Sequence, residues 1–148
     1  MRKSASLLDL GTGGGERLLE MRGCWPPKVV ATEGYHPNWR LASDRLEPLG
    51  AKVVLQEHSH GVRMPFADGE FDLVLNRHSG LDSIEIARIL ALGGTFFTEQ
   101  VNGMWAYDLL EVFGAKPKWP WASLENYEPQ ITTAGLTIVD SRTWTGHL

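Results

Sequence analysis

The chain has 148 residues, 43% of them hydrophobic and 22% charged, which suits one folded domain over residues 1–148 and excludes a disordered chain. Its net charge of −4 offers no basic surface for nucleic acid, and its one cysteine, Cys24, cannot build a disulfide framework or a cysteine-based metal site. No signal peptide follows Met1 and no apolar run approaches a membrane span, so we expect a cytoplasmic protein without a membrane partner.

The first element combines an apolar strand with a glycine-rich turn. Residues 6–10, SLLDL, predict a buried strand that carries one carboxylate, Asp9. Four glycines then lead into a helix over residues 14–22. Such a unit places a ligand against backbone N–H groups at the carboxyl end of a parallel sheet. The dinucleotide fingerprint G-x-G-x-x-G would need glycine or alanine at position 16, where this chain has Glu16.

A second strand ends in an acidic residue. Residues 28–32 predict the strand, and Glu33 and Gly34 follow it directly. An acid at this strand tip, roughly 20 residues beyond a glycine loop, suits a ribose, because two vicinal hydroxyls can both donate to one carboxylate. Tyr35 is a candidate for contact with an adenine ring.

The next helix and strand are predicted over residues 37–47 and 51–55. Trp39 belongs to the apolar stripe of this helix, so we expect it in the core rather than in a ligand site. The segment after the strand holds an acid and two histidines, Glu57, His58 and His60. H-x-H spacing without other ligands nearby is a weak metal signal, and we expect no metal.

The segment 64–74, MPFADGEFDLV, predicts a turn at its D-G pair and a buried strand over residues 72–75. Phe66 and Phe71 should pack around the turn, and we interpret Asp72 as a structural acid rather than a catalyst. Four polar residues end the strand at the sheet edge that carries the glycine loop: Asn76, Arg77, His78 and Ser79.

His78 is the candidate general base, because a neutral imidazole can accept a proton near pH 7. A histidine with a purely structural hydrogen bond is an equally open interpretation. In a third interpretation, Asn76, Arg77 and His78 shape the pocket of an acceptor substrate.

Two motifs resemble the class I S-adenosylmethionine-dependent methyltransferases. The pattern D-x-G-x-G-x-G, from Asp9 to Gly15, resembles motif I of that family, and PFADGEFDLV resembles its segment leading into strand 4. The resemblance implies that the glycine loop approaches the amino-acid part of S-adenosylmethionine and that Glu57 is nearest to the adenine amino group, although the usual Asp-Ala is absent there. The implied cofactor-binding residues are Asp9, Gly11, Thr12, Gly13, Gly15, Glu33, Gly34, Glu57 and Asn76.

The rest of the chain continues the alternation of helices and strands. We expect a helix over residues 82–90 that begins with the capping-box pair Asp82 and Glu85, and we expect Ile84 on its buried side. The later elements are a strand at 95–101, a helix at 102–113, a helix at 123–134 and a strand at 136–140. The loop AKPKWPW between the two later helices contains two tryptophans, which either pack under the loop or line a substrate lid.

These elements predict an α/β fold, a Rossmann-like doubly wound, mostly parallel sheet with helices on both faces. The family's seventh strand, and the helix before its first strand, have no counterpart here, so a shortened enzyme or a fragment is expected. The leading function is methyl transfer to a small molecule, and the alternative is a non-catalytic cofactor-binding or interaction module. A gap beside the fifth strand would leave backbone groups unpaired, so a homodimer can fill it.

Overall fold

The computed structural model describes residues 4–57 and 60–144. The chain divides into two compact units, one reaching to Val101 and the other beginning at Asn102. Each unit is described by itself.

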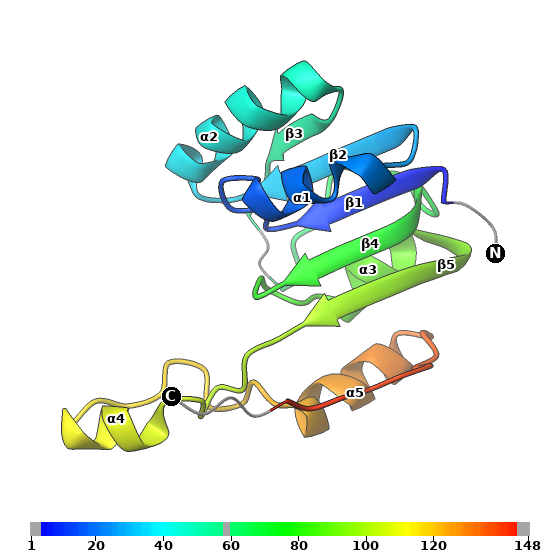
Figure 1. Cartoon of the computed structure of the whole chain (residues 1–148). Helices are drawn as coiled ribbons and strands as arrows, with labels where there is room; N and C mark the ends of the chain where they lie inside the picture. Colours follow the sequence, from blue (N-terminus) through cyan, green and yellow to red (C-terminus); the bar gives the residue numbers. More distant parts are fainter. Residues whose placement is uncertain (1–3, 58–59, 145–148) are drawn as a thin grey trace. The chain divides into compact units, whose positions relative to one another are not determined.

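The first unit contains a five-stranded sheet in which all strands are parallel (Figure 1). The strand order is β3-β2-β1-β4-β5, so the order reverses between β1 and β4. The strands are β1 (Ser6–Leu10), β2 (Lys28–Glu33), β3 (Lys52–Leu55), β4 (Phe71–Arg77) and β5 (Leu90–Glu99). This topology confirms the predicted Rossmann-like fold, and the reversal is where such sheets bind ligands.

Helices cover both faces of this sheet. Right-handed connections put α1 (Glu16–Glu20) and α2 (His36–Leu46) on one face and α3 (Ser83–Ile89) on the other. Short 3-10 turns follow α1 and α2 at Arg22–Cys24 and Glu47–Leu49. The α1–α2 face forms a core of buried residues, namely Leu7, Leu18, Val29, Ala31, Ala42, Leu46, Ala51 and Val53. Trp39 packs against this core, as predicted.

Two polar clusters hold the start of β4 and the turn that precedes it. The Asp72 carboxylate accepts hydrogen bonds from the Ala5 and Ser6 backbone N–H groups at 2.9 and 3.2 Å, which confirms its structural role. Arg88 of α3 donates to the Phe66 carbonyl at 2.8 Å and pairs with Glu85 at 2.7 Å. Phe66 and Phe71 meet edge to face, with ring centroids 5.1 Å apart, so their predicted packing is also confirmed.

Three details of the predicted first unit were wrong. The strand predicted at 95–101 runs from Leu90 to Glu99 as β5. Helix α1 ends at Glu20 rather than near residue 22, because the chain tightens into a 3-10 turn. Ile84, which was expected on the buried side of its helix, is 68% exposed. The Asp82 carboxylate caps α3 by accepting from the Ile84 and Glu85 N–H groups, and in the helix that starts there Ile86 and Ile89 face the core.

The second unit contains α4 (Tyr107–Val112) and α5 (Leu124–Thr133), which carries Pro129 within its span. The strand predicted at 136–140 is wrong: this stretch is irregular. An alternating apolar pattern forms a strand only beside a partner strand, and within this unit the described residues offer none. Among the described residues, no helix is long and apolar enough to cross a membrane.

Candidate functional site

An open hollow of about 520 Å³ lies at the carboxyl edge of the sheet. Its walls come from the loops that follow β1, β2, β3 and β4. The lining residues are Gly11, Glu33, Gly34, Tyr35, Glu57, His78 and Ser79. Parallel strands end together at this edge, so segments far apart in the sequence meet there. The volume lies within the range of about 300–1,000 Å³ that is typical of small-molecule sites.

Some glycines of the loop pack against other side chains, and one faces open space. Gly11 has a φ of +67°, and a Cβ there would lie 2.5 Å from the Ser79 hydroxyl oxygen. Gly15 has a φ of +83°, and its Cβ would meet Leu46 at 2.8 Å. A Cβ at Gly13, where φ is +62°, would meet no atom within 4 Å. The chain therefore needs Gly11 and Gly15 for packing, while Gly13 leaves space that a ligand can occupy.

Glu33 joins the glycine loop to the loop after β2. Its carboxylate accepts the Gly13 N–H at 2.7 Å and the Tyr35 N–H at 2.8 Å. These two bonds hold the carboxylate in place, and only 8% of the residue is exposed. Each carboxylate oxygen retains a lone pair for a further donor, so this geometry fits a ribose diol.

Buried Asp9 and partly exposed Arg77 form an ion pair next to the hollow. Asp9 is 1% exposed, and the Arg77 Nη2 atom lies 3.8 Å from its Oδ2 atom. Burial raises the pKa of Asp9, while the Thr12 hydroxyl and the Arg77 charge act in the opposite direction. Asp9 and Thr12 are buried and are not among the residues that line the hollow.

His78 follows β4 in the left-handed region, with a φ of +56°. It is the only residue other than glycine with positive φ among the described residues. Its backbone N–H donates to the Glu99 carbonyl at 2.9 Å, and the residue lines the hollow. A bulky residue in this conformation costs about 1–2 kcal/mol, and such strain is concentrated at functional sites.

Asn76 lies near the end of β4 as predicted, but it does not line the hollow. It is fully buried, its amide nitrogen donates to the Gly80 carbonyl at 2.9 Å, and its oxygen accepts from Gln100 at 2.9 Å. A residue that solvent cannot reach cannot contact a ligand in the hollow. The structure therefore gives Asn76 a supporting role, because it holds the loop that carries His78 and Ser79.

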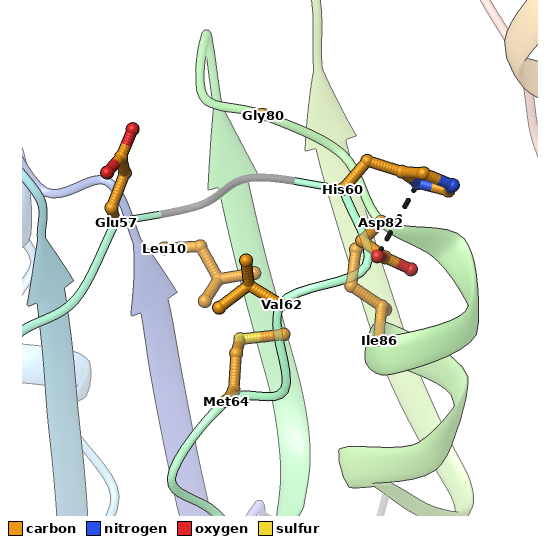
Figure 2. Close-up of a pocket in the computed structure, with 8 residues that line it drawn as sticks. All are labelled: Leu10, Glu57, His60, Val62, Met64, Gly80, Asp82 and Ile86. Carbon is orange, nitrogen blue, oxygen red and sulfur yellow. Dashed lines mark ion pairs between the residues drawn. The ribbon is translucent and has the colours of Figure 1, made fainter.

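A second cavity lies on the α3 side of the sheet, and Figure 2 shows its lining. At about 20 Å³ it has room for about one water molecule. His60 and Asp82 form an ion pair there at 3.5 Å, and the Glu57 carboxylate points away from that pair. His58 of the weak metal motif lies outside the described residues, and within those residues no group of three potential metal ligands occurs.

The structure places some of the predicted site residues on the wall of the hollow and others outside it. The hollow brings together six residues that the sequence suggested as candidates: Gly11, Glu33, Gly34, Tyr35, Glu57 and His78. Sequence reasoning did not assign a role to Ser79, whose contact with Gly11 depends on the approach of two loops. Its position directly after His78 was the only available signal.

Residues 8–98 match the family model described as a methyltransferase domain. The match spans more than half of the chain, so this chain belongs to that family, whose cofactor is S-adenosylmethionine. The loop geometry agrees with such a cofactor, because the space at Gly13 lies beside the Glu33 carboxylate. A comparison with curated proteins returns no match.

Three solved structures illustrate the similarity of the fold. A chain of the complex between the Haloferax volcanii Trm112 methyltransferase activator and a methyltransferase is 22% identical, with a TM-score of 0.74, over 95% of this chain and 65% of that one. The Streptomyces coelicolor geranyl diphosphate C-methyltransferase, solved with S-adenosyl-L-homocysteine, is 16% identical, with a TM-score of 0.67, over 87% and 51% of the chains. The [4+2]-cyclase SpnF is 20% identical, with a TM-score of 0.71, over 95% and 53%. This chain thus spans less than two thirds of each of these proteins.

Proposed function

We propose that this chain binds S-adenosylmethionine in the hollow and transfers its methyl group to a small-molecule acceptor. The observation that carries the proposal is the empty space at Gly13 beside the Glu33 carboxylate. Glycine gives a ligand access to the backbone there, and the acid can accept from a ribose. The proposal treats residues 1–148 as one functional domain in the cytoplasm.

Different residues of the hollow bind different parts of S-adenosylmethionine in this proposal. Glu33 accepts the ribose hydroxyls, the Tyr35 ring lies against the adenine, and Glu57 accepts from the adenine amino group. Gly11 and Gly13 admit the amino-acid part. When bound, S-adenosylmethionine supplies a methyl group on a sulfonium that leaves as a neutral thioether, so the protein mainly positions the reactants and excludes water.

His78 is the proposed general base for acceptors that must lose a proton. It is exposed, and its strained backbone fixes it on the wall of the hollow. An imidazole in that place can accept the proton as the acceptor atom attacks the methyl carbon. Acceptors that react as neutral amines do not need a base during attack, so His78 is required only for some of them.

A small molecule is the proposed acceptor for two reasons. The net charge of −4 disfavours a nucleic-acid substrate. In addition, a solved neighbour of the same fold acts on geranyl diphosphate, a small molecule.

The alternative function is a cofactor-binding module that does not transfer a methyl group by itself. Its support is the outer edge of β5, beside which the described residues place no further strand. An exposed strand edge is a site for pairing with another chain. A second copy is the simplest such partner, and one neighbour of this fold was solved with an activator protein. Native mass spectrometry at several concentrations, with and without S-adenosylhomocysteine, tests for the pairing.

The experiment that tests the cofactor proposal is isothermal titration of the purified chain with S-adenosylhomocysteine and with NAD. We expect saturable binding of the first ligand only. Glu33→Ala should weaken it about 10- to 100-fold through lost hydrogen bonds to a charged group. Glu20→Ala, which removes an exposed acid on α1, is the matched control and should bind as wild type does. Transfer assays with a panel of acceptors then separate the enzyme from the binding module.

A further inference from the structure

A cation without a hydrogen-bonded acceptor lies at the end of β4. The Arg77 Nε atom is buried and donates to no acceptor among the described residues. The nearest acid, Asp9, is 3.8 Å from the guanidinium, beyond hydrogen-bond distance, and its Oδ2 atom also lacks a hydrogen bond there. The side chain as a whole is only partly buried, but a buried N–H group without an acceptor is costly, so this arrangement favours a further anion beside Arg77.

Arg77 lies next to one end of the hollow. Leu10 and Asn76 are register partners on the adjacent strands β1 and β4, so Gly11 and Arg77 follow at the same level of the sheet. Gly11 lines the hollow, and so do the two residues after Arg77. The Arg77 side chain is 24% exposed, so a ligand can approach part of it.

The lining of the hollow has two chemically different ends. Glu33, Tyr35 and Glu57 surround the end that suits an adenosine, while Gly11 and His78 form the other end. A ligand that places its ribose on Glu33 therefore extends its other substituent toward Gly11 and Arg77. In S-adenosylmethionine that substituent is an amino acid with a carboxylate.

We propose that Arg77 binds the carboxylate of the amino-acid part of S-adenosylmethionine, an inference that rests on the proposed function. Guanidinium and carboxylate groups match as bidentate partners, because two parallel N–H groups meet two oxygens. The carboxylate meets the exposed part of the guanidinium, and there it supplies a hydrogen-bond acceptor that Asp9, at 3.8 Å, does not. The competing explanation is that Arg77 only neutralises Asp9 and never meets the ligand.

The test compares two probes that differ in one group, S-adenosylhomocysteine and its decarboxylated analogue S-adenosyl-3-thiopropylamine. Isothermal titration measures the affinity ratio of the two for wild type, Arg77→Gln and the control Arg40→Gln, which alters an exposed arginine of α2. We expect wild type and Arg40→Gln to prefer S-adenosylhomocysteine about 10- to 100-fold and Arg77→Gln to show a ratio near one.

The outcomes separate the two explanations. A ratio in Arg77→Gln equal to that of wild type, or a ratio near one in wild type, overturns the role of Arg77. Wild type that binds neither probe refutes the proposed function itself. If Arg77→Gln does not fold, Arg77→Lys replaces it: a point charge should lower the ratio without abolishing it, and an unchanged ratio overturns the proposal.

Discussion

Replacing Gly13 with alanine separates a loop shaped for a ligand from a loop that only turns the chain. Gly13 and Gly50 both have positive φ, +62° and +98°, and a Cβ at either one would meet no atom within 4 Å. Alanine at either position should therefore cost about 1–2 kcal/mol of folding stability through backbone strain alone. Gly50 ends the 3-10 turn after α2, whereas the Gly13 N–H donates to Glu33 on the wall of the hollow, so Gly50→Ala is the matched control.

Only the Gly13 variant should affect binding. The new methyl group would stand in the space assigned to the ligand, next to the N–H that donates to Glu33 at 2.7 Å. A displaced ligand loses at least one hydrogen bond to a charged group, worth about 1.5–3 kcal/mol, so its affinity should fall about 10- to 100-fold.

Two measurements decide this prediction. Urea unfolding should give similar losses of stability for Gly13→Ala and Gly50→Ala. Titration with S-adenosylhomocysteine should then show weakened binding for Gly13→Ala and wild-type binding for Gly50→Ala. Wild-type affinity in Gly13→Ala, or an equal loss in both variants, would refute the assignment of this space to the cofactor.

Three further predictions concern the surroundings of the site. His78→Gly should raise the free energy of unfolding in urea by about 1 kcal/mol, because glycine relieves the left-handed backbone; an unchanged or lower urea midpoint would contradict the claim that this backbone is strained. If His78 is the general base, the same variant should lose at least about 100-fold in turnover and keep its affinity for S-adenosylhomocysteine. Burial raises the pKa of Asp9, so just above the ordinary value of 3.8 the folded chain keeps a proton that the unfolded chain has lost. Wild type should therefore gain stability relative to Asp9→Asn as the pH falls through that window. Urea midpoints of both proteins from pH 7 to 4 check this, and a constant difference would count against it. Arg88→Met should cost about 2 kcal/mol or more in the same assay, because it leaves Glu85 without its 2.7 Å partner, whereas the exposed control Arg17→Met should cost under about 0.5 kcal/mol.

The parts of the fold that the sequence predicts are those set by local pattern. The apolar run at residues 6–10, the glycine spacing after it and the acid at position 33 each reflect one strand and the turn beyond it. Parallel strands end at a common edge, so these local motifs were enough to predict that Gly11 and Glu33 line one hollow.

The features that sequence reasoning missed depend on contacts between distant segments. Asn76 ends a strand as predicted, but its burial depends on Gly80 and on Gln100, which lies beyond β5. The contact between Gly11 and Ser79 likewise joins the loops after β1 and β4. The stretch at 136–140 has a strand-like pattern and no strand beside it within its own unit, so its local signal was misleading.

The most direct test of the central claim is a calorimetric titration of the folded wild-type chain with S-adenosylhomocysteine, repeated in the presence of excess NAD. We predict saturable one-site binding that NAD does not reduce and that Glu33→Ala weakens about 10- to 100-fold. A folded chain that gives no binding, or whose affinity does not depend on Glu33, would contradict the account.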